Sequence, residues 1–296
     1  MVPTPSVETA VVDPSSPVRA EGGRGTHPVV LGLLSGILLW LAFPPADLGY
    51  LAWFALVPLF RLVGSDRPRW SLYLGAWGGG LAFSLLAVEW VRRTDPSAWL
   101  GWLVLGVYLS LYWPAFLGLA RAGVRRLHLP PLLVLPVAWV GLEFLRAFAL
   151  TGFPWLYLAH TQYRDLPLIQ IADLTGVWGP SLLVALVNTW LVIVLEGVRS
   201  GVGQGGWKPS RSEMGATGIV AALVGAAAIY GFVRIQTAHF RPGPRVALLQ
   251  SNFEQELKSS LEPEQIIAEY RGLMARAVRE RAQLIVWPET AFPYYG

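Results

Sequence analysis

The chain has 296 residues, of which 54% are hydrophobic and 14% are charged. An ordinary soluble domain has about 25% charged residues, so this composition excludes a protein with a large water-covered surface. The net charge of +4 does not indicate nucleic-acid binding, because the lysines and arginines form short clusters between apolar runs, as in membrane proteins. The absence of cysteine excludes disulfides and a cysteine nucleophile. The four histidines are scattered, so no metal ion or other cofactor is predicted.

Residues 1–27 are rich in proline, serine, glycine and threonine, which predicts a disordered N-terminal tail. Residues 28–235 follow as an α-helical membrane bundle, for which about seven transmembrane helices are predicted. The apolar runs lie at residues 29–43, 49–63, 71–91, 98–120, 131–150, 174–198 and 215–233. A spanning helix needs roughly 20 apolar residues, so the first two runs are short and a re-entrant pair remains an alternative.

The loop charges predict the orientation of the bundle. With a cytoplasmic N-terminus, the cytoplasmic loops carry Arg19, Arg24, Arg61, Arg67, Arg69, Arg121, Arg125, Arg126, Arg199, Lys208 and Arg211. The opposite loops carry only Arg92, Arg93, Arg146 and Arg164. Because lysine and arginine are retained on the cytoplasmic side, this orientation is favoured. Seven spans then place the chain after about residue 234 outside the cytoplasm.

In residues 244–296 the long apolar runs give way to a strand–helix–strand pattern, which predicts the start of an α/β domain. Arg245–Gln250 has the pattern of a strand, and Ser260–Gln283 that of an amphipathic helix. Leu284–Trp287 is a continuous apolar run, which predicts a strand buried on both faces. About fifty residues cannot close a core of this type, so the domain is expected to be incomplete and the chain to be part of a longer protein.

Glu289 is the best catalytic candidate. Pro288 cannot donate to a sheet, so the strand ends there and Glu289 follows its carboxyl end, where active sites of α/β sheets gather. Trp287, Phe292 and Tyr294 flank the carboxylate and are expected to desolvate it in part, which suits a general base. A solvated loop glutamate is the alternative.

The segment LIVWPET at residues 284–290, preceded by VALLQSN at 246–252 and a helix, resembles the first block of the nitrilase superfamily, whose domains have an αββα architecture. The membrane part resembles one family within it, the bacterial apolipoprotein N-acyltransferases. This second resemblance rests on four segments taken in order, residues 41–45, 108–112, 143–146 and 150–155. It covers about residues 28–296. One departure is Ser251, where the superfamily often has glycine.

The resemblance implies a reaction and a location. The reaction transfers an acyl chain from a phospholipid to the α-amino group of the diacylglyceryl-cysteine of an apolipoprotein, through a cysteine thioester. Glu289 would be the general base of a Glu-Lys-Cys triad. The chain would lie in the bacterial cytoplasmic (inner) membrane as a multi-pass protein. Its only lysines, Lys208 and Lys258, precede Glu289, and it has no cysteine, so these residues alone are expected to be inactive.

Further candidates lie in the membrane part. Gly152, Phe153, Pro154 and Trp155 follow the fifth run and are interpreted as a substrate-contact loop or as an interfacial aromatic anchor. Glu143 and Arg146 are spaced to pair on one helix and are either functional or structural. The glycines at residues 78–80 indicate close helix packing rather than a phosphate loop.

Two alternative functions remain open. A membrane-tethered nitrilase-type amidase would share the region of Glu289 and would hydrolyse amides without a lipid acceptor. A non-catalytic scaffold or remnant would use the soluble segment only for packing. A transporter is less favoured, because transporters tend to have repeated halves and this sequence shows no internal repeat.

Overall fold

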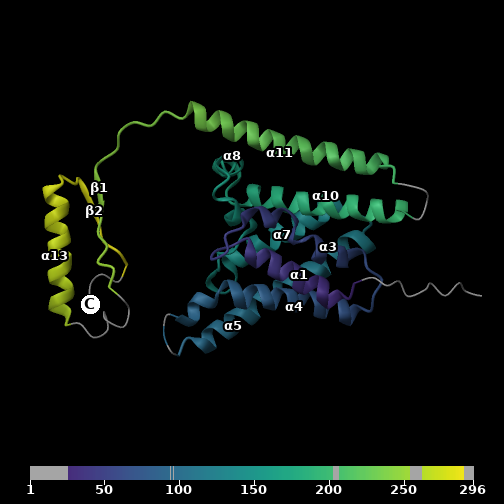
Figure 1. Ribbon diagram of the computed structural model, residues 1–296, viewed down its shortest axis with the longest axis horizontal. Coiled ribbons are helices and arrows are strands. Elements are labelled where there is room, and N and C mark those ends of the chain that lie inside the picture. The colour runs from purple at the N-terminus through teal and green to yellow at the C-terminus, as the bar shows by residue number, and fades with distance from the viewer. Residues whose placement is uncertain (1–25, 94, 96, 203–206, 254–261, 290–296) are drawn as a thin grey trace, which may run out of the picture.

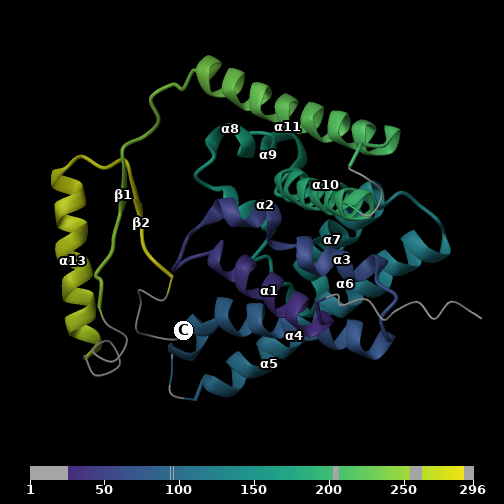
Figure 2. The same cartoon turned by 45° about the vertical axis from the view of Figure 1, so that its right-hand side comes forward.

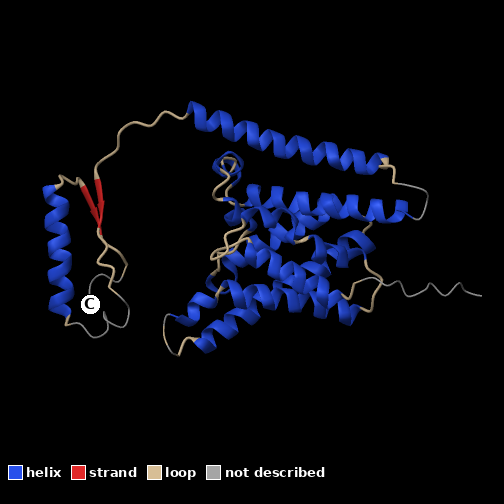
Figure 3. Cartoon of the chain, in the orientation of Figure 1, coloured by secondary structure: helices blue, strands red, loops and turns tan. Residues whose placement is uncertain are grey.

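The computed structural model describes residues 26–93, 95, 97–202, 207–253 and 262–289. Most of the predicted disordered tail therefore lies outside the described residues. Within them the chain is mainly helical, and the strands are two short segments near the C-terminal end (Figure 3).

Every predicted apolar run contains a helix. The helical elements of the first half are α1 (Pro28–Leu41), η1 (Gly49–Leu51), α2 (Ala52–Ala55), α3 (Val57–Gly64), α4 (Arg69–Ala87), η2 (Glu89–Arg93), α5 (Trp99–Ser110), α6 (Tyr112–Arg121) and η3 (Ala122–Arg126). The second half contains α7 (Pro131–Phe148), η4 (Ala149–Thr151), η5 (Leu158–Gln162), α8 (Leu166–Ile169), α9 (Ala172–Thr175), α10 (Trp178–Val202), α11 (Arg211–Thr237) and α13 (Pro263–Arg279).

Among the residues that the structure describes, four helices are long and apolar enough to cross a membrane. They are Trp99–Arg126, Pro131–Phe148, Trp178–Gly201 and Arg211–Thr237. Three shorter apolar helical stretches, Pro28–Leu41, Gly49–Gly64 and Leu166–Thr175, accompany them. The prediction of a polytopic helical membrane protein is thereby confirmed in this coarser form, whereas the count of seven spans stays a prediction.

Helices α1 and α4 pack with almost no space between their backbones. A β-carbon at Gly32 would lie 1.8 Å from the carbonyl oxygen of Gly75, and one at Gly36 would lie 2.3 Å from that of Gly79. Small residues spaced four apart allow such contact, which dispersion forces then stabilise in an apolar solvent. The packing role predicted for residues 78–80 is confirmed for Gly79 and Gly80, whereas a β-carbon at Gly78 would meet no atom within 4 Å.

The segment 49–64 is broken into short helices inside the bundle, and side chains of other helices satisfy its backbone. Asn188 of α10 accepts a hydrogen bond from the Leu56 amide at 2.9 Å and donates to the Ala52 carbonyl at 2.8 Å. Ser35 of α1 accepts one from the Leu59 amide at 2.9 Å. Within a bilayer an unpaired backbone group costs several kcal/mol, so these side chains make the break possible.

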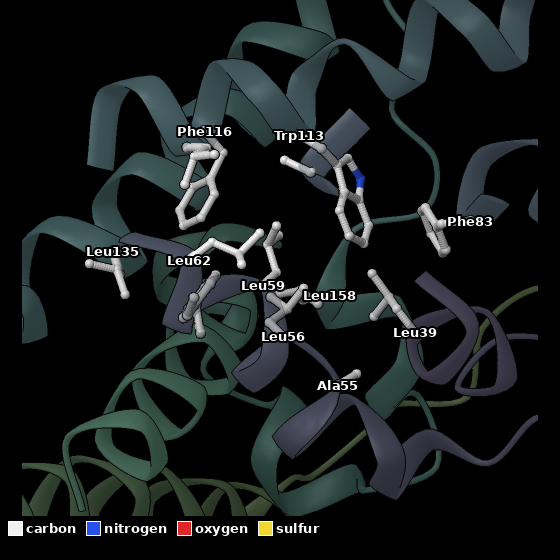
Figure 4. Packing of buried hydrophobic residues seen from close by; sticks show 14 of the residues in the cluster. Leu39, Ala55, Leu56, Leu59, Leu62, Phe83, Trp113, Phe116, Leu135 and Leu158 are labelled. Carbon is white, nitrogen blue, oxygen red and sulfur yellow. The ribbon is translucent and has the colours of Figure 1, made fainter. Parts of the chain in front are cut away.

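The apolar core lies where these broken segments meet α1, α4, α6 and α7. Figure 4 shows side chains from the different helices pointing toward one another, with Leu59 and Leu62 of α3 near Phe116 and Trp113 of α6. The rings of Phe60 and Phe116 stack at 4.9 Å. Leu158 of η5 belongs to the same cluster, which anchors the irregular segment after α7 to the bundle.

The strands β1 (Val246–Leu248) and β2 (Leu284–Val286) pair in parallel, with Ala247 opposite Ile285. Helix α13 packs against one face of this pair through Ile266, Tyr270 and Ala277, as its apolar spacing predicts. The prediction that the second strand is buried on both faces is wrong for the described residues. Leu284 is 49% exposed and Val286 is 41% exposed, because no described element covers the other face.

The clusters of arginine lie at two ends of the bundle. Arg61 at the end of α3 pairs with Glu196 of α10 at 2.6 Å, and Arg121 of α6 donates to the Ser65 carbonyl at 2.9 Å. These contacts gather the ends of α3, α6 and α10, which carry the loops predicted to be cytoplasmic. Figures 1 and 2 show the β1–β2–α13 unit apart from the helices, beyond the end where α8 lies and away from the α10–α11 connection.

Candidate functional site

Glu289 lies three residues beyond the end of β2, on the edge where both parallel strands end. Its side chain is exposed, whereas the sequence predicts partial desolvation by three aromatic rings. Of these rings only Trp287 is described, since Phe292 and Tyr294 lie outside the described residues. The position at a carboxyl edge is thus confirmed, and the catalytic role of Glu289 stays a prediction.

The groups beside Glu289 are held by α13. The ring of Trp287 stacks on that of Tyr270 at 5.1 Å, and the Tyr270 hydroxyl is hydrogen-bonded to the Ser251 hydroxyl at 2.9 Å. Tyr270 therefore links the turns that follow β1 and β2. This arrangement fixes the backbone from which Glu289 projects.

The loop Gly152–Trp155 turns back over the C-terminal end of α7. Gly152 has a φ of 86°, and a β-carbon there would lie 2.2 Å from the Ala147 carbonyl oxygen, so only glycine fits. The amide of Phe153 then donates to the Arg146 carbonyl at 2.8 Å. The loop therefore has a defined conformation, which the positive φ of Gly152 and the backbone hydrogen bond to the end of α7 determine.

Two charged residues of α7 hold the chain that follows the loop. Arg146 donates from one guanidinium nitrogen to the carbonyls of Trp155 at 2.9 Å and Leu156 at 3.2 Å. Glu143 accepts at Oε1 from the Leu158 amide at 2.9 Å and from the Trp139 indole at 3.1 Å. The expected direct pairing of Glu143 with Arg146 is not formed, because each side chain makes its hydrogen bonds to this segment, although the two charges still attract each other.

Aromatic rings surround the buried guanidinium of Arg146. It lies 5.3 Å from the centre of the Tyr157 ring and 5.9 Å from that of Tyr112. A cation facing the negative side of an aromatic ring is stabilised where water is excluded. The Tyr112 hydroxyl is hydrogen-bonded to that of Tyr108 at 2.7 Å, which extends the polar cluster along α5 and α6.

A small cavity opens beside this cluster. Its volume is about 20 Å³, enough for a single water molecule, and Glu143, Arg146, Tyr112 and Leu156 line it. The Glu143 Oε2 and Arg146 Nε atoms are buried without a hydrogen-bond partner. A water molecule in the cavity would satisfy such groups, but a substrate would not fit.

The exposed part of the loop is aromatic. The ring of Trp155 stacks on that of Trp90 in η2 at 5.1 Å, and the Phe153 ring lies 5.9 Å from it. Trp155 and Trp90 are both about half exposed. Half-exposed indoles are typical of the membrane–water interface, where the ring is apolar and its edge is wet.

The structure does not bring Glu289 and the loop together. The β1–β2–α13 unit stands apart from the helical bundle that carries the loop, so the two predicted sites are separate in this structure (Figure 1). Among the described residues, no group of three histidine, aspartate or glutamate side chains is placed to hold a metal ion.

The helical bundle that carries the loop matches a known protein family. The family model described as apolipoprotein N-acyltransferase N-terminal domain matches residues 35–190, which is more than half of the chain. This segment runs from α1 to the middle of α10 and contains Glu143, Arg146 and the loop Gly152–Trp155. The chain belongs to the apolipoprotein N-acyltransferase family.

Individual relatives agree with this assignment. The apolipoprotein N-acyltransferase of Geobacter metallireducens is 36% identical over 276 residues, covering 90% of this chain and 51% of the relative. The protein of the same name from Rhodopirellula baltica is 32% identical over 275 residues, covering 86% of this chain and 47% of the relative. The chain therefore spans about half the length of the curated relatives it matches.

The way in which this member of the apolipoprotein N-acyltransferase family positions its loop does not follow from the helical spacing of Glu143 and Arg146, which predicts only that these two residues pair. Trp90 and Tyr157 have no predicted role in the sequence. One signal in the sequence does point to this arrangement. Glu143 and Arg146 lie on an apolar helix, and ionised groups at membrane depth need polar partners. The glycine and proline in the ten residues after Arg146 indicate irregular backbone, whose unpaired amides and carbonyls can serve as those partners.

Proposed function

We propose that this chain forms the membrane half of an apolipoprotein N-acyltransferase. The observation that carries the proposal is the family match over residues 35–190, joined by relatives of that name across about nine-tenths of the chain. The substrates would be a phospholipid acyl donor and a diacylglyceryl apolipoprotein acceptor. The location would be the bacterial cytoplasmic membrane, with the N-terminus in the cytoplasm and the β1–β2–α13 unit outside it.

Glu289 would act as the general base of this reaction. It would take the proton of a cysteine thiol, and the thiolate would attack the ester carbonyl of the phospholipid. The Glu289 carboxyl would return that proton to the departing lysophospholipid oxygen, leaving a thioester. The regenerated carboxylate would then take a proton from the attacking amine and give it to the cysteine sulfur, as the thioester breaks, the new amide forms and the thiol is restored. A lysine would stabilise the oxyanion of each tetrahedral intermediate. The exposed position beyond β2 supports this role, because a base must reach its substrate.

These 296 residues would not complete the reaction alone. They contain no cysteine, and both lysines precede Glu289. The cysteine and the lysine would then come from residues outside these 296, in the same or in another chain.

The uncovered sheet face supports a nitrilase-like domain around Glu289. Val246, Leu248, Leu284 and Val286 are all at least 41% exposed on the face opposite α13. An apolar sheet face is stable only when a second layer covers it. In the proposed αββα architecture a second sheet would provide that layer.

The loop Gly152–Trp155 would contact the acyl donor. Its indole is half exposed, and Phe148 and Leu150, shortly before it in the chain, are 69% and 79% exposed. Such apolar side chains would meet acyl chains at the outer face of the membrane.

A chimera tests the proposal. In it, residues 1–296 are followed by the part of the Geobacter metallireducens relative that this chain does not match, and the protein is reconstituted with phospholipid and a diacylglyceryl peptide. We expect N-acylated peptide by mass spectrometry. In the chimera, Glu289→Gln is expected to lower the rate at least about a hundredfold, which is typical for loss of a general base.

Controls separate the alternatives. Glu280→Gln removes another exposed carboxylate of the same unit and should leave the rate unchanged. The unfused chain should give no product. Amide hydrolysis without transfer would favour an amidase instead, and full activity of the Glu289→Gln chimera would exclude Glu289 as the base.

A further inference from the structure

A basic pocket lies at the end of the bundle opposite the loop Gly152–Trp155. Its volume is about 410 Å³, and it lies between the start of α4 and the end of α6. Arg69 and Tyr73 line it from α4, and Arg121, Arg125 and Arg126 line it from the end of α6 and from η3. Helix α7 begins beside this end and runs about 27 Å to the loop, at 1.5 Å per residue.

The local backbone brings three arginines to the pocket. Residues Ala122–Arg126 form a π-helical turn, in which the Leu127 amide donates to the Ala122 carbonyl at 3.1 Å. Such a turn places residue i+5, rather than only i+4, beneath residue i. Arg126 therefore joins Arg125 on the side of Arg121.

Two of these arginines are already bound to the protein. Arg121 donates from one nitrogen to the carbonyls of Leu62 at 3.0 Å, Val63 at 3.1 Å and Ser65 at 2.9 Å, at the end of α3. Arg125 donates to the Ser65 carbonyl at 2.9 Å and pairs with Asp66. These contacts fix the guanidinium groups before any ligand arrives.

The other two arginines are free to bind. Arg69 and Arg126 are exposed, and neither guanidinium group forms a hydrogen bond or an ion pair within the part of the chain that the structure describes. In the same part, Asp66 is the one carboxylate that pairs with an arginine of the pocket. The pocket therefore holds an excess of three positive charges, which repel one another unless an anion enters.

The chemistry of the pocket matches a phosphate group. Guanidinium groups bind phosphate oxygens through paired N–H donors, and arginine exceeds lysine in this role. The Tyr73 hydroxyl lies over Gly118, 3.3 Å from where a β-carbon would be, and offers a further donor at the floor of the pocket.

The surroundings favour a lipid over free phosphate. The pocket lies where the apolar helix Trp99–Arg126 ends, and large apolar side chains are exposed beside it. These are Trp70 and Leu74 on α4, Leu119 on α6, and Leu127. Basic pockets between membrane helices bind anionic headgroups, while the flanking apolar side chains can contact acyl chains.

We propose that this pocket binds an anionic phospholipid through its phosphate group, with the acyl chains lying along α4 and α6. The site is distinct from the proposed acyl-transfer site, because α7 separates the two along its length. The bound lipid would link α4 to the α6–η3 end and would neutralise its excess charge.

Titration of the lipid-depleted chain in detergent tests the proposal, with bound lipid counted by native mass spectrometry. We expect saturable binding of phosphatidylglycerol and none of phosphatidylcholine. The double variant Arg69→Gln/Arg126→Gln should weaken binding at least about tenfold, because two charge-assisted contacts are lost. Gly118→Val, which fills the floor without changing charge, should also weaken it.

The matched control is Arg199→Gln/Arg211→Gln, which removes the same charge from α10 and α11 at the same end of the bundle. It should weaken binding no more than about twofold, because the solution screens charges outside the pocket. Equal loss in both double variants would overturn the proposal and leave only a general charge effect. Tighter binding of inorganic phosphate than of phosphatidylglycerol, each titrated alone, would overturn the lipid as the ligand.

Discussion

The carboxylate of Glu143 accepts a hydrogen bond from the backbone amide of Leu158, fifteen residues later, at 2.9 Å. Both groups are buried, and between them the chain leaves α7, forms the loop Gly152–Trp155 and returns to the core. Together with the hydrogen bonds from Arg146 to the carbonyls of Trp155 and Leu156, this bond holds the returning chain against the end of α7. We call Glu143 and Arg146 with these bonds the polar clamp; it fixes the position of the loop.

Replacement of Glu143 tests the clamp. In Glu143→Ala the amide of Leu158 and the indole of Trp139 lose their acceptor, and each buried unpaired donor costs roughly 1–3 kcal/mol. We expect Glu143→Ala to lower the free energy of unfolding by about 3 kcal/mol, and Glu143→Gln by less, since its amide oxygen still accepts. Thermal unfolding in detergent measures both. Equal losses of unfolding free energy in the two variants would show that the negative charge of Glu143, rather than its hydrogen bonds, stabilises the loop.

Gly152 tests the geometry of the loop. Gly152→Ala would place a β-carbon 2.2 Å from the Ala147 carbonyl oxygen at a positive φ, so we expect a loss of about 1–3 kcal/mol in unfolding free energy. The control is Gly141→Ala, within α7, where a β-carbon meets no atom within 4 Å. Alanine there should stabilise by roughly 0.5–1 kcal/mol. A neutral Gly152→Ala would contradict the loop conformation.

The helices could be predicted from the sequence, because an apolar run of sufficient length has few alternatives to a helix. The break at residues 49–64 could not, since it depends on Asn188, which lies more than a hundred residues further along the chain. Its amide satisfies a backbone that an apolar pattern alone would leave helical. Long-range polar pairing of this kind is not encoded in local periodicity.

The candidate sites were predicted in position but not in surroundings. Pro288 ends β2 by removing a donor, so the place of Glu289 follows from local chemistry. The burial of β2 does not, because it depends on which elements cover its second face. The direct contact expected between Glu143 and Arg146 is not formed for a similar reason, since helical spacing ignores competing backbone groups outside the helix.

Neighbouring glycines of α4 provide a matched test of its packing on α1. A β-carbon at Gly79 would lie 2.2 Å from the Gly32 carbonyl oxygen, whereas one at Gly78 meets nothing within 4 Å. We expect Gly79→Ala to separate the helices and to lower the melting temperature, and Gly78→Ala to leave it unchanged or raise it. Disulfide cross-linking between cysteines placed on α1 and α4 would report the separation. Similar behaviour of the two variants would contradict the close contact.

The ion pairs of Glu89 in η2 should make the stability of the folded chain depend on pH. Hydrogen bonds from Arg92 at 2.8 Å and Arg93 at 2.9 Å lower the pKa of Glu89 below its ordinary value of 4.5. The folded state therefore favours the carboxylate, and this stabilisation is present above the unfolded pKa and is lost as pH falls through the folded pKa. The difference in melting temperature between the native chain and Glu89→Gln should vanish in that acidic range. A difference that persists there would show another role for Glu89.

Trp155 tests whether the loop touches the acyl donor. In the active chimera, Trp155→Ala removes an indole that stacks on Trp90 at 5.1 Å and is half exposed. Loss of an aromatic contact of about 1 kcal/mol should raise the KM for phospholipid roughly fivefold with little change in kcat. Trp207→Ala, another exposed indole at the other end of the bundle, should leave both unchanged. A fall in kcat alone, or equal effects of the two variants, would indicate an interfacial anchor rather than a substrate contact.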